Sequence, residues 1–151
     1  MRTFFDTNVL VYLFDEDAPA NKARAQKLLE EEVSRGQAVL STQVLQEFYV
    51  SVTRKLAEPL ESEMAERAVR DLAVLPLIQI DAQMILAAIR RSRDFQHSFW
   101  DALIIEAAIT SGADRLFTED LQHGQLIESV RIENPFLIGT VGEPGSAGVG
   151  E

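Results

Sequence analysis

The sequence contains no cysteine, which excludes disulfide bonds and thiolate metal sites, so any bound metal ion must take oxygen or histidine ligands. It also lacks an apolar run of the roughly 18 residues that a membrane-spanning helix needs, and no secretory cleavage pattern follows Met1. Glycine-rich phosphate-binding loops of the nucleotide-binding types are absent as well. From these absences we expect a cytoplasmic protein with no membrane contact.

Basic residues are few, with 14 Lys and Arg against 24 Asp and Glu, and the formal net charge is −10. Such a surface repels nucleic acid as a whole, which argues against a simple DNA-binding module. The argument reverses locally if several carboxylates share divalent cations, because bound ions invert the field around them and can attract a phosphate group. The positions of the acids therefore carry the functional information.

The sequence does contain an alternation of short apolar segments and longer segments with helical periodicity. The 151 residues, 46% of them apolar, have the size and composition of one globular domain. We expect strands at 2–5, 38–40, 77–80 and 115–117, and helices that start near 7, 19, 42, 61, 82 and 98. This alternation predicts an α/β domain with a central, mostly parallel sheet of about five short strands flanked by helices.

The domain is expected to span residues 1–138. The remaining segment, 139–151, holds five of the eight glycines and has little apolar surface to bury, so we predict that it is a flexible tail. Within the helices, the spacing of apolar residues places Val33, Met64 and Trp100 on buried faces.

Four acidic residues sit beside apolar segments, whereas most of the 24 acids fall on polar helix faces. Asp6 ends the first expected strand, and Asp120 follows the strand at 115–117. Glu47 lies at the edge of an apolar helix face, and Asp101 lies in the first turn of another helix. Taken singly, each has a structural explanation: the two strand-end acids as helix caps, Asp101 as a favourable charge at a helix start, and Glu47 as solvated surface.

The four acids are harder to explain together, because strand ends and helix starts can meet at one edge of a parallel sheet. Two carboxylates about 4 Å apart repel each other by roughly 4 kcal/mol at an effective dielectric constant of about 20. A fold that keeps such repulsion needs a cation. Oxygen ligands suit Mg²⁺ or Mn²⁺, which can bind a scissile phosphate and activate water, and Thr7, Asn8 and Thr118 are placed to orient ligands or water.

The four acids belong to the segments Asp6-Thr7-Asn8, Gln43-Val44-Leu45-Gln46-Glu47-Phe48, Ser98-Phe99-Trp100-Asp101-Ala102-Leu103-Ile104 and Thr118-Glu119-Asp120. In this order the segments resemble the motifs of the PIN-domain ribonucleases, and among them those of the VapC-type toxins of toxin–antitoxin pairs. The resemblance extends over about residues 2–136. It implies a three-layer PIN-like domain whose catalytic and metal-binding residues are Asp6, Glu47, Asp101 and Asp120, with Glu119 as the alternative to its neighbour.

The same resemblance implies an activity and partners. It predicts a Mg²⁺-dependent endoribonuclease, in which Mn²⁺ can substitute, that cleaves RNA and forms a homodimer. It also predicts a cognate antitoxin protein that inserts a segment near the acidic site. An antitoxin segment rich in arginine would be attracted to so acidic a cleft.

Residues that contact RNA are less well defined by the sequence. Phosphate contacts could come from Arg54, Lys55, Arg90, Arg91 and Arg93, although such clusters are more often helix-end charges on a solvated face. The aromatic residues Phe95, Phe99 and Trp100 could stack on bases, but we expect them to pack in the core. We assign His97 and His123 no catalytic role, because a lone histidine is usually structural.

Several other functions remain open at this stage. A magnesium phosphatase that forms a phosphoaspartate would want an Asp-x-Asp pair, but position 8 is Asn. A DNA-directed nuclease on a similar sheet is a second alternative. The others are a PIN nuclease that processes RNA outside a toxin–antitoxin pair, and a catalytically silent PIN-fold module that uses its acids only to bind a basic partner.

Overall fold

Six short strands form one sheet in the computed structural model, which describes residues 1–137. The strands are β1 (Thr3–Phe5), β2 (Ala38–Ser41), β3 (Leu77–Ile78), β4 (Arg115–Phe117), β5 (Leu126–Ile127) and β6 (Val130–Glu133). Their order in the sheet is β3-β2-β1-β4-β6-β5, and only β5 runs antiparallel to its neighbour. The predicted α/β class and mostly parallel sheet are confirmed, and β1 lies in the middle of the sheet.

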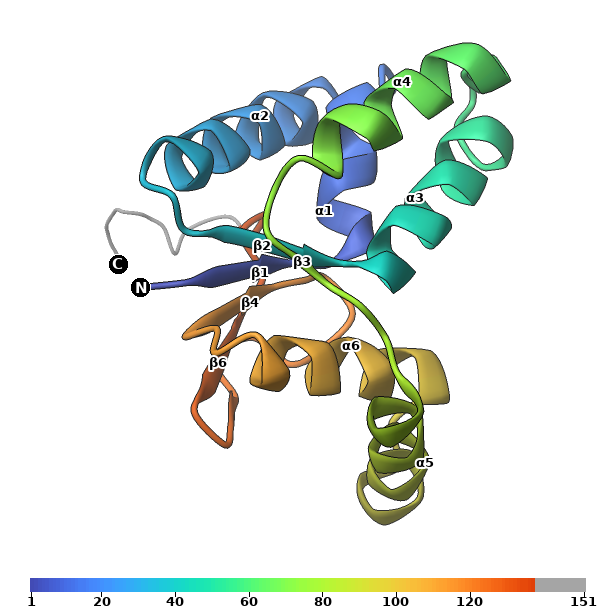
Figure 1. Ribbon diagram of the computed structural model, residues 1–151. Helices are drawn as coiled ribbons and strands as arrows, with labels where there is room; N and C mark the ends of the chain where they lie inside the picture. Colours follow the sequence, from blue (N-terminus) through green and yellow to red (C-terminus); the bar gives the residue numbers. More distant parts are fainter. Residues whose placement is uncertain (138–151) are drawn as a thin grey trace.

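Helices cover both faces of this sheet, which makes the three layers visible in Figure 1. One face carries α1 (Thr7–Val11), α2 (Pro19–Ser34), α3 (Thr42–Arg54) and α4 (Ser62–Leu72), and a short 3₁₀ turn (Tyr12–Phe14) follows α1. The other face carries α5 (Ala82–Phe95) and α6 (Phe99–Thr110).

Capping side chains set the helix starts where the sequence predicts them. Ser41 accepts the N–H of Val44, and Asp81 accepts the N–H of Met84. Ser98 likewise accepts the N–H of Asp101, so α3, α5 and α6 each begin with a satisfied backbone donor.

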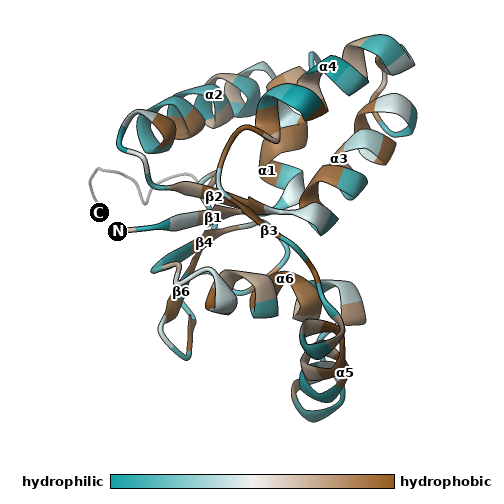
Figure 2. Ribbon diagram, viewed as in Figure 1, coloured by the Kyte–Doolittle hydropathy of each residue, from teal (hydrophilic) through white to brown (hydrophobic). Residues whose placement is uncertain are grey.

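The strands form most of the core, and Figure 2 shows their hydrophobic character in the middle of the molecule. Phe4, Phe5, Leu40, Leu116 and Ile132 are completely or almost completely buried. Burying a side chain of this size contributes about 1.5 to 3 kcal/mol relative to leaving it in water. Both faces of β1 are buried because helices lie above and below it.

Three helical residues predicted to be buried are exposed. Met64 and Trp100 expose 54% and 59% of their surface, and Val33 is also exposed. In α6, apolar residues occur on nearly all sides of the helix, so the sequence pattern does not show which side faces solvent. The expected core position of Trp100 was therefore wrong, and Phe95, at the end of α5, is also exposed rather than packed in the core.

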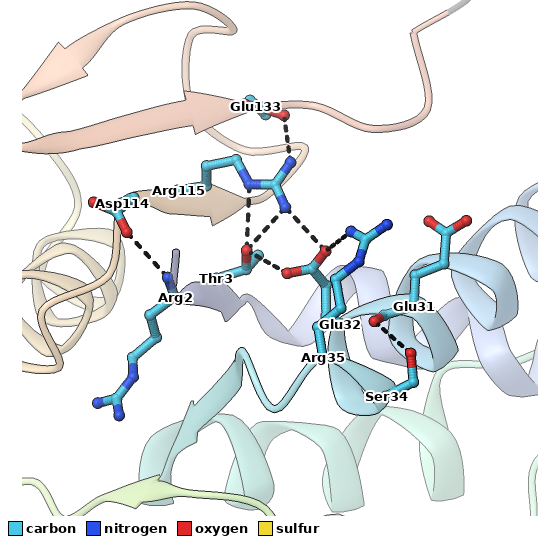
Figure 3. Close-up of polar contacts among 9 residues, drawn as sticks. All are labelled: Arg2, Thr3, Glu31, Glu32, Ser34, Arg35, Asp114, Arg115 and Glu133. Carbon is cyan, nitrogen blue, oxygen red and sulfur yellow. Dashed lines mark hydrogen bonds and ion pairs between the residues drawn. The ribbon is translucent and has the colours of Figure 1, made fainter.

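A cluster of charged residues links α2 to the sheet near the first residue of β1 (Figure 3). We call Thr3, Glu32, Arg35, Arg115 and Glu133 the clasp. The Glu32 side chain accepts hydrogen bonds from Thr3 Oγ1 at 2.8 Å and from Arg115 Nη2 at 3.0 Å, and it pairs with Arg35 Nη1 at 3.4 Å. Arg115 Nη1 also lies 3.7 Å from Glu133. The clasp therefore joins α2 to β1, β4 and β6.

Two sequence predictions concern membrane contact and the C-terminal segment. Within residues 1–137, no helix is both long and apolar enough to cross a membrane. The predicted flexible tail, 139–151, lies outside the described residues, as does residue 138 at the expected end of the domain.

Candidate active site

Asp6 follows the last residue of β1 and forms the N-cap of α1. Its Oδ1 accepts the backbone N–H of Thr7 at 2.7 Å, and its Oδ2 accepts the hydroxyl of Thr118 at 2.8 Å. The residue is only 4% exposed. Burial raises the pKa of Asp6 to about 7, because the two hydrogen bonds that favour the ionised form do not offset desolvation. The negative charges of Asp120 and Glu47 make smaller contributions to the same rise.

The capping explanation for Asp6 is thus correct as geometry, yet it does not account for the site. A cap on an exposed helix start keeps a carboxylate ionised in water. Here the cap is buried, and its nearest electrostatic neighbours include two further carboxylates. Burial and the neighbouring negative charges therefore destabilise the ionised form of Asp6, and a bound cation would stabilise it.

Asp120 is held near the end of β4 by Asn8, which lies in α1, and by Thr118, which directly follows β4. Its Oδ2 accepts Nδ2 of Asn8 at 2.9 Å, and its backbone N–H donates to Oγ1 of Thr118 at 3.0 Å. The hydroxyl of Thr118, which is fully buried, donates in turn to Asp6. Asn8 and Thr118 therefore hold the two strand-end acids in one network, as the sequence predicts for supporting residues.

Glu47 lies on the second turn of α3 and points toward α1. Its Oε1 accepts the hydroxyl of Thr7 at 2.8 Å, and its Oε2 accepts Nε2 of Gln43 at 3.1 Å. Gln43 is one turn earlier on the same helix, a spacing at which side chains meet. The same Nε2 donates to the carbonyl of Trp100 at 3.2 Å, which connects α3 to the start of α6.

Asp101 is in the first turn of α6, after the cap Ser98. Burial raises the pKa of its carboxyl group, and the negative charge of Asp120 adds to the rise. Ser98 and His97 lower the pKa, and Glu47 raises it by a smaller amount. The negative charges of Asp120 and Glu47 therefore both act on Asp101, although α6 and α3 lie on opposite faces of the sheet.

Glu119 has a partner of its own beside Asp120. Both of its carboxylate oxygens accept the hydroxyl of Tyr12, at 3.0 and 3.1 Å. Asp120, in contrast, contributes to the pKa shifts of both Asp6 and Asp101. The geometry thus favours Asp120 over Glu119 as the fourth acid of the cluster.

The acids line a single open cavity of about 820 Å³ at the carboxyl ends of β1 and β4. Its acidic residues are Asp6, Asp15, Glu47, Asp101, Glu119 and Asp120. Among the described residues that line it, Lys55 is the sole basic one. The cavity also has apolar lining, which includes Val50, Ile104 and Trp100. We call this space the acidic cavity.

The donor set of the acidic cavity fits a hard divalent cation. Every candidate ligand is an oxygen atom, and the pKa values of Asp6 and Asp101 are raised by burial first and by the neighbouring carboxylates second. In residues 1–137, however, no three Asp, Glu or His side chains are already arranged as a metal site. Thr7, Thr118, Asn8 and Gln43 instead occupy carboxylate oxygens with their hydrogen bonds. Each of these side-chain hydrogen bonds is individually weak, so together they do not exclude a cation from the shared cavity.

The arginines predicted to contact RNA lie elsewhere. Arg91 forms ion pairs with Glu106 at 2.5 Å and Glu128 at 2.8 Å, which fix α5 against α6 and the turn between β5 and β6. Arg54, Arg90 and Arg93 are exposed, and none of the four arginines is among the described residues lining the acidic cavity. Their contact with RNA stays a prediction.

Both histidines lie beside the acids in sequence, and their placement differs. His123 accepts the backbone N–H of Asn134 at 3.0 Å, which is a structural role outside the acidic cavity. His97 precedes the cap of α6 and acts on Asp101 through its charge.

Two polar residues of the cavity, Tyr12 and Gln43, had no role in the sequence analysis, whereas Lys55 was named there as a possible phosphate contact and does line the cavity. Gln43 could have been found from its spacing of four residues before Glu47 on one helix. Its Oε1 is buried and, within residues 1–137, has no hydrogen-bond partner. Tyr12 follows α1, and no short sequence pattern connects it to Glu119 across 107 positions.

Solved structures similar to this chain include proteins of toxin–antitoxin systems. The protein is similar to a toxin–antitoxin complex from Klebsiella pneumoniae, with a TM-score of 0.67 and 20% identity, covering 90% of this chain and 99% of that chain. It is also similar to VapC20 of Mycobacterium tuberculosis, a sarcin-ricin loop cleaving toxin. That TM-score is 0.63 at 18% identity, covering 78% of this chain and 91% of that chain.

A further similar structure is VapBC2 from Rickettsia felis, bound to a DNA fragment from its promoter. The TM-score is 0.63 at 18% identity, covering 88% of this chain and 98% of that chain. At these identities the likeness establishes the fold.

Sequence comparison identifies the family. No curated protein matches the sequence, but the family model of the PIN domain matches residues 3–126. The matched span contains Asp6, Glu47, Asp101 and Asp120, and it covers the sheet from β1 to the start of β5. The chain therefore belongs to the PIN domain family.

Proposed function

We propose that this protein is a metal-dependent endoribonuclease and that it is the toxin of a type II toxin–antitoxin pair. The observation that carries the proposal is the acidic cavity, to which Asp6, Glu47, Asp101 and Asp120 come from four separate elements. Membership of the PIN domain family and the likeness to VapC20 support it.

When bound, Mg²⁺ or Mn²⁺ supplies Lewis acidity toward the phosphate group of RNA and lowers the pKa of water. The four acids would hold the ion, and its positive charge would favour their ionised forms. The hydroxyl groups of Thr118 and Thr7 orient the carboxyl groups of Asp6 and Glu47. Burial of Asp6 keeps bulk water from competing for its oxygens.

Cleavage of RNA by purified protein tests the nuclease. The parent should cleave a mixed RNA substrate in the presence of Mg²⁺ or Mn²⁺, and EDTA should stop it. Asp6→Asn and Asp101→Asn should each lower the rate by at least about 100-fold, because a lost ligand weakens ion binding at the reacting phosphate. Asp71→Asn is the matched control, since it removes the same charge from an exposed position on α4. Equal rates for the parent and both site variants would refute the proposal.

A second pair of variants decides between the neighbouring acids. Asp120→Asn should abolish most of the activity, whereas Glu119→Gln should leave most of it, because Glu119 is bonded to Tyr12. The opposite ranking would make Glu119 the fourth acid of the site.

The toxin role needs a test in cells. Induced expression of the parent should arrest bacterial growth, and expression of Asp6→Asn should not. Co-expression of a small neighbouring open reading frame should restore growth if that gene encodes the antitoxin. RNA cleavage in vitro without growth arrest would instead support a PIN nuclease of RNA processing. The absence of both cleavage and growth arrest would support a catalytically silent binding module.

We also propose that the protein forms a homodimer. An exposed apolar face on α5, formed by Ile85, Leu86 and Ile89, supports this, because such patches commonly mark protein interfaces. Light scattering should give the parent a molar mass of two chains. It should give the Leu86→Glu variant a molar mass of one chain. A monomeric parent would contradict the proposal.

A further inference from the structure

Trp100 is the single tryptophan of the chain, and it lies at the acidic cavity. It exposes 59% of its surface, although a tryptophan offers more apolar surface for burial than other side chains. The next residue, Asp101, is one of the four acids. The indole therefore stands open to solvent beside the proposed reaction centre.

One contact supports the indole ring of Trp100, and another holds its backbone. Phe99 packs against it edge to face, with ring centroids 5.1 Å apart and an interplanar angle of 75°. The Gln43 side chain, which also holds Glu47, donates to the Trp100 carbonyl at 3.2 Å. An exposed aromatic ring with such supports is a preorganised surface, so little entropy is lost when a planar group packs on it.

Charge attraction explains little of RNA binding at this site. Six carboxylates and one lysine line the cavity, so a phosphate chain that approaches without cations meets repulsion. Stacking of a base on an aromatic ring does not depend on the sign of the surrounding charge and is available for every base. The base must be unpaired, since bases in a duplex already stack on each other.

We propose that Trp100 stacks on a base of single-stranded RNA and thereby positions the neighbouring phosphate at the acidic cavity. The inference rests on the proposed ribonuclease function and adds the substrate class and a positioning residue to it. Trp100 contributes binding energy and takes no part in bond breaking.

Steady-state cleavage of an unstructured oligoribonucleotide tests this role. Trp100→Ala should raise KM by roughly 5- to 100-fold, the range that base–aromatic stacking supplies. The kcat value should change little, because the lost interaction binds substrate and transition state alike. Trp100→Phe should restore most of the affinity. Phe95→Ala, which removes an exposed aromatic ring outside the cavity, should leave both parameters unchanged.

Fluorescence gives a readout independent of activity, because Trp100 is the only indole. In the Asp6→Asn protein, which should bind without cleaving, the unstructured oligoribonucleotide should quench the emission. An abasic oligonucleotide of equal charge should quench it much less, and double-stranded RNA should have almost no effect. Equal quenching by the normal and abasic strands would overturn stacking.

The outcomes separate this inference from the proposed function. RNA cleavage by the parent, with unchanged KM in Trp100→Ala and no quenching, overturns the stacking role and leaves the nuclease standing. Base-dependent quenching without any cleavage by the parent overturns the nuclease and leaves the stacking role standing. If Trp100→Ala changes the mass in solution or abolishes binding of a protein partner while KM stays constant, the ring belongs to a protein interface and the inference is wrong.

Discussion

Two buried carboxyl groups lie at opposite ends of the three-residue strand β1, and their surroundings differ. Glu32, in the clasp, is 2% exposed, and Asp6, in the acidic cavity, is 4% exposed. Glu32 meets the guanidinium groups of Arg115 and Arg35, whereas Asp6 meets a hydroxyl, a backbone N–H and the fields of other carboxylates. Similar burial thus leaves Glu32 in ion pairs at one end of β1 and Asp6 without a positively charged partner at the other. Partners, rather than burial, decide which end can bind a cation.

The largest expected effect comes from removing the cation of the clasp. Arg115→Met should lower the free energy of unfolding by about 3 to 5 kcal/mol, because it leaves Glu32 as a buried charge with only the more exposed Arg35. Urea denaturation measures the change. Arg70→Met, which breaks an exposed pair with Glu66 on α4, should cost about 0.5 kcal/mol or less.

A double variant sharpens this result. Arg115→Met combined with Glu32→Gln should cost less than Arg115→Met alone, since the uncompensated charge is gone. A loss below about 1 kcal/mol in Arg115→Met would show that the clasp does not neutralise Glu32 as described.

The next effect concerns the pH dependence of stability in the absence of metal. The pKa of Asp6 is about 7 in the folded chain against 3.8 as its ordinary value. Between these values the folded state keeps a proton that the unfolded state has lost, so stability falls as pH rises from about 4 to 7 and stays low above that. Below about pH 4 Asp6 is protonated in both the folded and the unfolded state, so it no longer destabilises the fold.

Asp6→Asn should therefore flatten this part of the curve. In EDTA at pH 8 the variant should be more stable than the parent by about 2 to 4 kcal/mol, with no gain at pH 4. Urea midpoints across the pH range measure this. A variant less stable than the parent at pH 8 would show that the two hydrogen bonds to Asp6 outweigh its desolvation.

A divalent cation bound in the acidic cavity should supply the positive charge that Asp6 lacks at its end of β1. At a concentration near 100 times its dissociation constant, Mg²⁺ or Mn²⁺ should stabilise the parent by about 2.7 kcal/mol, which corresponds to roughly 5 to 10 °C in Tm. Asp101→Asn should reduce the shift, and Glu32→Gln should leave it intact because the clasp is far along the strand. An unchanged Tm of the parent in millimolar Mn²⁺ would count against an acidic metal site.

The smallest effect is expected from the hydroxyl of Thr118. Thr118→Val should cost about 1 to 2 kcal/mol, because it removes a buried donor to Asp6 and an acceptor for the Asp120 N–H. It should also raise the pKa of Asp6 further and shift the rising limb of the cleavage pH profile upward. Thr53→Val, whose hydroxyl bonds only to the backbone of α3, is the control. An identical profile in both variants would separate Thr118 from the site.

Local patterns predicted much of the fold. Caps and stops placed the helices within a few residues, because Ser41, Asp81 and Ser98 satisfy backbone donors wherever a helix starts. The hairpin of β5 and β6 was missed. Its turn, at Glu128 and Ser129, has none of the usual Asn-Gly chemistry, and Glu128 adopts a φ of 55°. The alternation of apolar Val130 and Ile132 with charged Arg131 and Glu133 was the available indication of a strand.

For the site, the sequence predicted which acids share a cavity and the supporting side chains of Thr7, Asn8 and Thr118, but not the remaining contacts. Asp6 and Asp120 follow parallel neighbouring strands, so the topology rule brings them together. The contacts of Tyr12 with Glu119 and of Gln43 with the Trp100 carbonyl join separate elements, and no local pattern encodes them. Trp100 was misplaced because α6 is apolar around most of its circumference.

The pairing of β1 with β4 has a consequence for the order of events during synthesis. Asp6 meets Thr118, and Asn8 meets Asp120, across 112 positions of sequence. Contacts that distant form slowly, because a long loop must close before they contribute any stability. A growing chain that ends before residue 118 lacks both Thr118 and Asp120, the partners of Asp6 and Asn8. The acidic cavity therefore cannot be complete before Asp120 has been synthesised and β4 has paired with β1.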